Sequence, residues 1–389
     1  MKIINTSEKR FKLVKFRFET DTGGYIDRHM ITDNLLPMFE VNQWIEMKSL
    51  RSSATGKEYA SKLVVFLNYL DHIGIEYQDA GNRHVLNFIH SLIYGDTISL
   101  IIKAPETVVS YSTLIKYITV ITGFYKWLDS NFSTNMRFGT KENPIRAQKS
   151  FLYGQIYTYE YSYLIDSALP RLKCSRIYTK WYTPEEKQRL VGALLSLRDK
   201  AVFLLTLEGF RIDEVLSMTL DSYNFAERMI QPTRSKGKPD VRSGNNYLRT
   251  VSLPAETCDV INRYIETERT QAENESNRIS QKLFINVNRG AHQGKSLTYT
   301  NYIKRLKSCA KRSGMDPSRI RTHNGRSTKV MEFLEHQALY PEDGITDAVI
   351  AESFGWSSID SIRHYRDHNN QIIAKTVNDK LHTKRGRHP

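Results

Sequence analysis

Apolar residues recur at intervals of three and four through much of the first third of the chain, between positions 41 and 132. The pattern occurs in four segments, VNQWIEMKSLR, TGKEYASKLVVFLNYLDHIG, NRHVLNFIHSLI and SYSTLIKYITVITGFYKWLDSNF. Such spacing places the apolar side chains on one face of an α-helix. Because the connections are short, the four segments predict a small all-helical domain over residues 41–132.

The residues on either side of this helical region follow other patterns. Residues 1–40 alternate weakly between polar and apolar in KLVKFRFET and GGYIDRHMI, which indicates a short β-hairpin around Gly23 and Gly24. Residues 133–182 are polar at first, then rich in tyrosine in YTYEYSYL, and then basic in RLKCSR. We interpret residues 133–182 as a linker.

A second domain begins at Thr183. Thr183, Pro184 and Glu186 have the spacing of an N-cap, a first-turn proline and the glutamate of a capping box. The run RDKAVFLLTLEGFRIDEVLSMTL predicts a buried helix pair broken near Gly209. Strand-like runs follow in MIQP, YLRTVSLP and LFINV, and helical patterns resume in YIKRLKSCAKRSG, GRSTKVMEFLEHQ, AVIAESFG and SIDSIRHYRDH. The expected fold is mostly α with a small antiparallel β-sheet: a helical domain, then an α+β domain over residues 183–370.

The chain is basic, and its positive charge is concentrated in the second half. Its 389 residues include 56 Lys+Arg and 42 Asp+Glu, which gives a net charge of +14. The first 170 residues hold 19 Lys+Arg and 17 Asp+Glu, whereas the remaining 219 hold 37 and 25. This balance points to a polyanionic partner, nucleic acid before a membrane surface.

Other features of the sequence exclude several classes of protein. No run of about 18 apolar residues predicts a transmembrane helix, and the start MKIINTSEKRF lacks the apolar core of a secretion signal. The three cysteines, Cys174, Cys258 and Cys309, are odd in number and widely spaced, so neither a disulfide framework nor a CxxC motif is expected. We therefore expect a cytoplasmic protein that works without a membrane, a metal or a cofactor.

Two basic features of the second domain have both a structural and a functional interpretation. Arg211 follows Gly209 in an apolar stretch, and a buried arginine needs a partner, which Asp213 or Glu214 could supply. Lys236 and Lys238 lie in the loop TRSKGKPDVRSGNN between two strand-like runs. This loop is either a solvated charge cluster or a basic finger for a nucleic-acid groove.

Four further residues carry little information individually. His323 and Arg326 are three apart, so they share one face of a helix. Trp356 and Tyr365 are each typical of a packed core. Only the order and spacing of these residues along the chain distinguish them.

That order resembles the tyrosine recombinase, or phage integrase, family. The shared pattern is GFRIDE, a lysine-bearing hairpin, HNGR and FGWSSIDSIRHY, in which Trp356 and Tyr365 are nine residues apart. The likeness covers about residues 183–370, and the helical region 41–132 is similar, less specifically, to the family's core-binding domain. Two positions depart from the commonest form, since Trp356 replaces a histidine and Ser327 follows Arg326 where the family often has histidine.

The resemblance implies a role for each motif residue, and the chemistry agrees with these roles. Arg211 and Arg326 would neutralise the phosphodiester oxygens, because a guanidinium binds phosphate bidentately and stays charged. Tyr365 would be the nucleophile and form a 3′-phosphotyrosyl bond. The remaining roles are assigned to His323 as base, Trp356 as an N–H donor to the phosphate, Lys236 (or Lys238) as the acid for the 5′-oxygen, and Glu214 as the residue that orients the arginine.

The resemblance also implies an assembly and a source. A recombinase of this family acts as a homotetramer on two double-stranded DNA attachment sites, in some cases with accessory DNA-bending or directionality factors. The tail, residues 371–389, has a helical pattern over about 370–382 that would pass to a neighbouring protomer or dock in cis. The expected source is a bacterium, a phage or another mobile element, with integrase, transposon recombinase and resolvase roles all open.

Three other functions fit parts of the sequence. A type IB topoisomerase-like enzyme would share the Arg, Lys, Arg, His/Trp and Tyr set and relax DNA as a monomer, but the helical N-terminal domain and the tail after Tyr365 favour recombination. A non-catalytic DNA-binding protein on a decayed recombinase fold would have lost motif positions, and none is lost. A metal-dependent nuclease is disfavoured because no DxD or HxxE cluster stands out.

Overall fold

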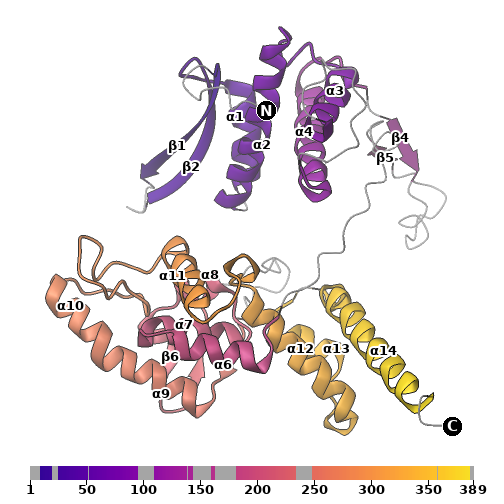
Figure 1. Cartoon of the computed structure of the whole chain (residues 1–389). Coiled ribbons are helices and arrows are strands. Elements are labelled where there is room, and N and C mark those ends of the chain that lie inside the picture. The colour runs from indigo at the N-terminus through magenta and orange to yellow at the C-terminus, as the bar shows by residue number, and fades with distance from the viewer. Residues whose placement is uncertain are drawn as a thin grey trace, which may run out of the picture. The chain divides into compact units, whose positions relative to one another are not determined.

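The computed structural model describes residues 9–19, 25–50, 52–94, 109–137, 139–142, 159–162, 181–233, 248–356 and 358–385. The chain divides into two compact units, Met1–Ser175 and Arg176–Pro389. Figure 1 shows the first in indigo and magenta, and the second from dark pink through orange to yellow.

The first unit begins with a β-hairpin. Strands β1 (Phe11–Glu19) and β2 (Tyr25–Asp33) pair antiparallel along their whole length, and the short β3 (Leu36–Pro37) adds to β2. One face of this sheet carries Phe11 and Ile31, which are buried in the same core as the helices. The hairpin expected around Gly23 and Gly24 thus has strands on both sides and packs on the helical region.

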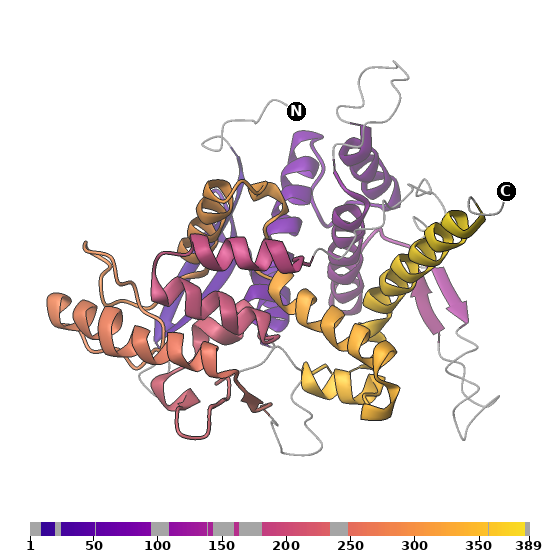
Figure 2. The same ribbon diagram turned by 60° about the horizontal axis from the view of Figure 1, so that its bottom comes forward.

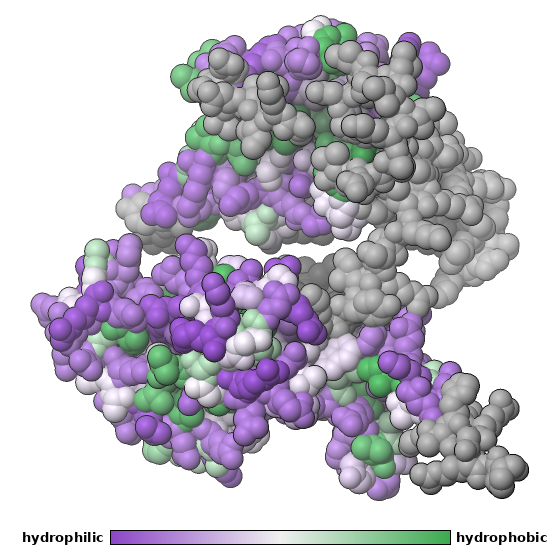
Figure 3. Space-filling view, in the orientation of Figure 1, coloured by the Kyte–Doolittle hydropathy of each residue, from purple (hydrophilic) through white to green (hydrophobic). Residues whose placement is uncertain are grey.

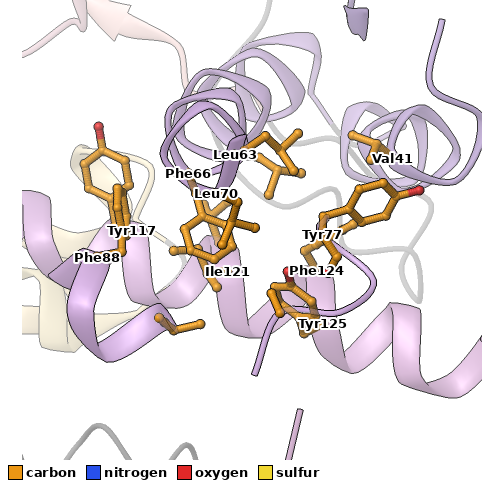
Figure 4. Packing of buried hydrophobic residues seen from close by; sticks show 14 of the residues in the cluster. Val41, Leu63, Phe66, Leu70, Tyr77, Phe88, Tyr117, Ile121, Phe124 and Tyr125 are labelled. Atoms are coloured by element: carbon orange, nitrogen blue, oxygen red, sulfur yellow. Dashed lines mark hydrogen bonds between the residues drawn. The ribbon is translucent and has the colours of Figure 1, made fainter. Parts of the chain in front are cut away.

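Four helices complete this core, as the apolar periodicity predicts. They are α1 (Phe39–Ser49), α2 (Ser53–His72), α3 (Asn82–Tyr94) and α4 (Tyr111–Asn131). Aromatic rings pack among aliphatic side chains in the interior: Phe66 meets Phe88 edge to face, with ring centroids 5.1 Å apart, and Tyr125 donates a hydrogen bond to the Tyr77 carbonyl (Figure 4). Because large rings bury much apolar surface, they contribute strongly to the stability of this unit.

Within residues 133–182, expected as a linker, the described part of the chain includes a pair of short strands. Strands β4 (Gly139–Glu142) and β5 (Tyr159–Ser162) pair antiparallel, with Gly139 opposite Ser162. The boundary between the two units lies within the same stretch, at Ser175.

The second unit starts with the helices that position the candidate site. Helix α6 (Pro184–Ala193) has the expected capping box at Thr183, and it is followed by α7 (Leu197–Leu207) and α8 (Ile212–Ser217). The break between α7 and α8 occurs at Gly209, whose φ is +89°. A side chain there would also lie 2.7 Å from the Phe354 ring, so only glycine fits this turn.

A small sheet and further helices form the rest of this unit (Figures 1 and 2). Strands β6 (Tyr223–Asn224), β7 (Met229–Ile230) and β8 (Val251–Ser252) form an antiparallel sheet in that order. The helices are α9 (Ala255–Tyr264), the π-helical turn η3 (Ile265–Arg269), α10 (Thr270–Ser276), α11 (Tyr299–Arg312), α12 (Asn324–Leu339), α13 (Asp347–Ser353) and α14 (Arg363–Arg385). The chain is therefore mostly α with small antiparallel sheets, as expected.

The segment LFINV does not form the expected strand. It makes one isolated β-bridge, between Ile285 and Ser296. Its backbone bonds go to several separate partners: the Leu283 N–H donates to the Met218 carbonyl and the Phe284 carbonyl accepts from Leu297, while the Tyr264 hydroxyl and the Arg198 guanidinium bind Leu283 and Ile285. The backbone groups are thus satisfied without one continuous neighbouring strand.

The tail is helical over the expected residues, about 370–382, as part of a longer helix. Helix α14 runs without interruption from the segment that bears Tyr365 to Arg385. No glycine or proline occurs between these points, so nothing in the sequence ends the helix. Residues 370–379 are exposed, and this half of the helix leads away from α12 towards the C-terminus in Figure 2.

Among the residues that the structure describes, no helix is both long enough and apolar enough to cross a bilayer. On the face shown in Figure 3, the second unit is mainly hydrophilic, with small separate apolar patches.

We expect Tyr302→Phe to stabilise the second unit. Tyr302 on α11 is completely buried, and its hydroxyl has no hydrogen-bond partner among the described residues. Removing an unsatisfied buried hydroxyl should raise the free energy of unfolding by about 1 kcal/mol. Urea unfolding of both proteins measures this difference, and a less stable variant would show that the hydroxyl has a partner.

Candidate active site

The turn before α8 holds Arg211 against a buried carboxylate. The Arg211 N–H donates to Glu214 Oε2 at 2.9 Å, and its Nη1 donates to Glu214 Oε1 at 2.6 Å. Glu214 is 2% exposed, whereas the Arg211 side chain is 21% exposed. Glu214 therefore holds the backbone N–H and one guanidinium nitrogen of Arg211, whose side chain stays partly exposed.

Glu214 is ionised in these surroundings. Burial alone would raise the pKa of its carboxyl group, but the Arg211 N–H and the charges of Arg249 and Arg211 together lower it. Arg249 Nη2 lies 3.2 Å from Glu214 Oε2, so two guanidinium groups share one carboxylate.

Arg326, at the start of α12, contacts the turn that precedes Arg211. Its Nη1 donates to the Gly209 carbonyl at 2.6 Å and its Nη2 to the Phe354 carbonyl at 2.5 Å, while its Nε has no partner among the described residues. Burial, with the charges of Arg211 and Arg249, lowers the pKa of Arg326 to about 9, so the group stays charged at neutral pH. This places a buried cation between the Gly209 turn and the end of α13.

A glycine allows α12 to approach α7 this closely. A Cβ at Gly325 would lie 2.5 Å from Thr206 Oγ1 and 2.9 Å from the Thr206 carbonyl carbon. The HNGR segment thus needs its glycine so that His323 and Arg326 reach the site.

His323 and Tyr365 are in direct contact. His323 Nε2 lies 3.2 Å from Tyr365 Oη. His323 is exposed, yet partial burial of its ring, with the charges of Arg326 and Arg211, lowers its pKa to about 4. A neutral imidazole can accept the phenol proton, whereas an imidazolium cannot.

Trp356 joins these residues into one cluster. Its ring stacks on Tyr365 with centroids 5.9 Å apart, and the Arg326 guanidinium lies 5.7 Å from the centre of the Trp356 ring. Tyr365 is 2% exposed, so most of its ring is held by packing before any substrate arrives. This packing restricts the position of the phenol oxygen.

The structure therefore brings most of the predicted site residues together. Arg211, Glu214, His323, Arg326, Trp356 and Tyr365 lie in one connected cluster. The predicted lysines, Lys236 and Lys238, lie outside the described residues.

Comparison with known proteins identifies the fold and the family. Residues 180–371 match the phage integrase family. The chain belongs to this family of tyrosine recombinases. The comparison with curated proteins found no match.

Two solved recombinases share the fold of this tyrosine recombinase. One is the XerH site-specific recombinase bound to palindromic difH substrate in a post-cleavage complex, with 15% identity, a TM-score of 0.57, and coverage of 86% of this chain and 82% of that chain. The other is the Tn1549 transposon integrase in complex with a circular intermediate DNA, with 15% identity, a TM-score of 0.52, and coverage of 86% and 98%. At these identities the likeness concerns the fold.

Arg249 is a residue of this recombinase's site that was not predicted from the sequence. It stands just before β8, in YLRTVSLP, among apolar residues. Like Arg211, an arginine in such an apolar run needs a partner. Its partners, Glu214 and the carbonyls of Gly209 and Ser353, are 35 or more residues away in the chain, so only the tertiary structure identifies them.

The described part of the recombinase contains no metal-binding cluster. No group of three or more His, Cys, Asp or Glu side chains within it could hold a metal ion. The positive charge at the site comes instead from Arg211, Arg249 and Arg326.

Proposed function

We propose that this chain is a site-specific DNA recombinase of the integrase or transposon type, which cleaves and rejoins DNA through a 3′-phosphotyrosine intermediate without a metal or ATP. One observation carries the proposal: a neutral histidine lies 3.2 Å from the hydroxyl of a buried tyrosine, within the field of two arginines. A structural tyrosine needs no such surroundings, whereas a nucleophile needs both a base and nearby positive charge.

In the cleavage step, Tyr365 Oη attacks the phosphorus and its proton passes to His323 Nε2. The phosphorus–oxygen bond to the 5′-oxygen breaks as the bond to Tyr365 forms. A free tyrosine has a pKa near 10, so proton removal by a nearby base speeds the attack at neutral pH.

The arginines stabilise the charge that develops on the phosphate. The partly exposed Arg211 side chain binds the nonbridging oxygens, and the buried Arg326 adds positive charge from the Gly209 turn. The Trp356 indole N–H is a further donor to the same oxygens. These groups supply the neutralisation that other phosphoryl-transfer enzymes obtain from metal ions.

The departing 5′-oxygen takes a proton from the hairpin lysine, Lys236 or alternatively Lys238. The phosphotyrosine keeps the energy of the broken bond, so a 5′-hydroxyl from another strand can restore the phosphodiester and release Tyr365. No high-energy cofactor is then required.

Recombination of two duplexes needs four cleavages, which assigns a homotetramer with one Tyr365 per protomer. The first unit, with its hairpin and four helices, is the core-binding unit that grips each double-stranded site. The exposed half of α14 carries Ile372, Ile373 and Val377, which are only partly buried in cis. Contact of these side chains with a neighbouring protomer would bury them and close the tetramer.

Covalent trapping on DNA tests the function. Wild-type protein is incubated in EDTA with randomised nicked duplexes, and adducts are separated on denaturing gels and sequenced. A protein–DNA adduct on a defined sequence is expected. Relaxation of supercoiled plasmid without a preferred sequence would instead indicate a topoisomerase, and tight DNA binding without any adduct would indicate a non-catalytic protein.

The pH dependence tests the role of His323. Because its pKa is about 4, His323 is neutral at pH 7 and becomes protonated only as the pH falls towards 4. At subsaturating DNA, the cleavage rate should therefore show no loss from histidine protonation between pH 8 and 6, and should fall below about pH 5. His364→Asn removes a neighbouring imidazole that is a lesser cause of the lowered pKa of His323, so the fall in rate should shift only slightly upward in pH; a fall centred near pH 6.5 would contradict the assignment.

A further inference from the structure

We propose that Arg249 is a positioning residue of the strand-transfer reaction, which sets the position of Arg211 through Glu214 and the Gly209 turn. The inference rests on the proposed function, since it concerns how the same site is held. Arg249 lies on no motif that the sequence singles out, and its side chain is 9% exposed. Arg249 therefore acts on the site through its contacts with other residues inside the protein.

Arg249 joins three separate parts of the catalytic unit. Its Nη1 donates to the Ser353 carbonyl at 2.6 Å, and its Nη2 donates to the Gly209 carbonyl at 2.9 Å and to Glu214 Oε2 at 3.2 Å. The guanidinium also lies 4.6 Å from the centre of the Phe210 ring. One side chain therefore connects the segment before β8, the turn that precedes Arg211, and the end of α13.

Arg249 and Arg326 brace the same turn from two sides. Both donate to the Gly209 carbonyl, and they cap two successive carbonyls at the end of α13, Ser353 for Arg249 and Phe354 for Arg326. The Phe354 ring lies near both guanidinium groups, at 6.0 Å and 5.1 Å. The position of the turn thus depends on both arginines.

The link to Arg211 is electrostatic as well as geometric. Glu214 Oε1 accepts from Arg211, and Oε2 accepts from both the Arg211 N–H and Arg249. A buried carboxylate needs compensating positive charge. Without Arg249, Glu214 loses one of its compensating charges and the Gly209 turn loses one donor, so the position in which Glu214 holds the Arg211 guanidinium shifts.

The surroundings of Arg249 make its removal tolerable for folding. Arg249 forms part of the wall of an open cleft of about 1280 Å³, which Val251, Phe333 and Glu352 also line. Water can enter from this cleft and bind the carbonyls that a shorter side chain leaves unpaired. The variant Arg249→Met is therefore expected to fold with reduced stability.

Single-turnover cleavage of a nicked duplex, chosen by the trapping experiment, separates positioning from folding. Arg249→Met is expected to lower the rate constant about 10- to 100-fold, with an unchanged adduct amplitude and an unchanged Kd for DNA. A purely structural role would lower the amplitude, through the folded fraction, and leave the rate constant alone. Arg249→Lys should recover part of the rate, because an ammonium can remain beside Glu214 but cannot reach all three acceptors.

The matched control is Arg269→Met. Arg269 is also a buried arginine, 6% exposed, and it pairs with Glu273 at 2.7 Å and with the Ser280 carbonyl at 2.6 Å, on elements that carry no proposed site residue. This variant should lose stability and keep the wild-type rate constant. An equal loss of rate in Arg249→Met and Arg269→Met would overturn the proposal.

A double-mutant cycle tests the path through Arg211. If Arg249 acts by positioning Arg211, the single-turnover rate constant should fall less than about 3-fold when Arg249→Met is added to the Arg211→Lys variant. Full additivity of the two losses, or a rate constant for Arg249→Met within 2-fold of wild type, would overturn the inference. If Arg249→Met does not fold, Arg249→Lys carries the same comparison. Absence of any adduct with the wild-type protein would instead reject the proposed function.

Discussion

Tyr365→Phe is expected to abolish the covalent protein–DNA adduct completely. The substitution removes the only atom of the side chain that can attack phosphorus, the hydroxyl oxygen 3.2 Å from His323 Nε2. The phenyl ring keeps its stacking on Trp356, so the fold and the affinity for DNA should stay close to wild type. Adduct formation on the trapped sequence, with a parallel gel-shift titration, measures both quantities.

The control for this prediction is Tyr302→Phe. Tyr302 is another buried tyrosine of the same unit, on α11, and its hydroxyl has no partner among the described residues. This variant loses the same oxygen atom from a different place and should form the adduct at the wild-type rate. An adduct that persists in Tyr365→Phe would show that another residue is the nucleophile.

Arg326→Lys is expected to slow cleavage about 100- to 1,000-fold, the cost of removing one donor that stabilises transition-state charge. The planar guanidinium reaches the Gly209 and Phe354 carbonyls at once, at 2.6 Å and 2.5 Å. A lysine ammonium has a different shape and cannot keep both bonds while facing the phosphate. Single-turnover cleavage at saturating DNA gives the rate constant directly.

Arg198→Lys provides the matched comparison. Arg198 is also fully buried, and it donates to Asp199 and to the Ile285 carbonyl on elements that hold no proposed site residue. Its replacement should lower the melting temperature and leave the cleavage rate of the folded protein unchanged. Equal rates for Arg326→Lys and wild type would remove Arg326 from the reaction.

The periodicity of apolar residues predicted the helices well, because each helix buries one continuous stripe. The four helical segments between 41 and 132, the capping box at Thr183 and the break at Gly209 all have local causes that can be read from a few neighbouring residues. The prediction for LFINV was wrong because its backbone bonds go to several separate segments and side chains, and not to one neighbouring strand. The β-propensity of these five residues does not depend on such tertiary bonds and so does not indicate them.

In the candidate site, too, some features follow from the sequence and others only from the tertiary structure. The motif order, and the nine residues between Trp356 and Tyr365, depend only on the identity of side chains along the chain, and they were sufficient to predict the family. The contact between His323 and Tyr365 joins residues 42 apart, and the three bonds of Arg249 join residues 35 to 104 apart. The identity of a residue and the periodicity of apolar positions involve only a few neighbouring residues, so both can be recognised from the sequence alone. The distances between these groups, and the sharing of one carboxylate by two arginines, arise only when the packed helices bring separate segments together.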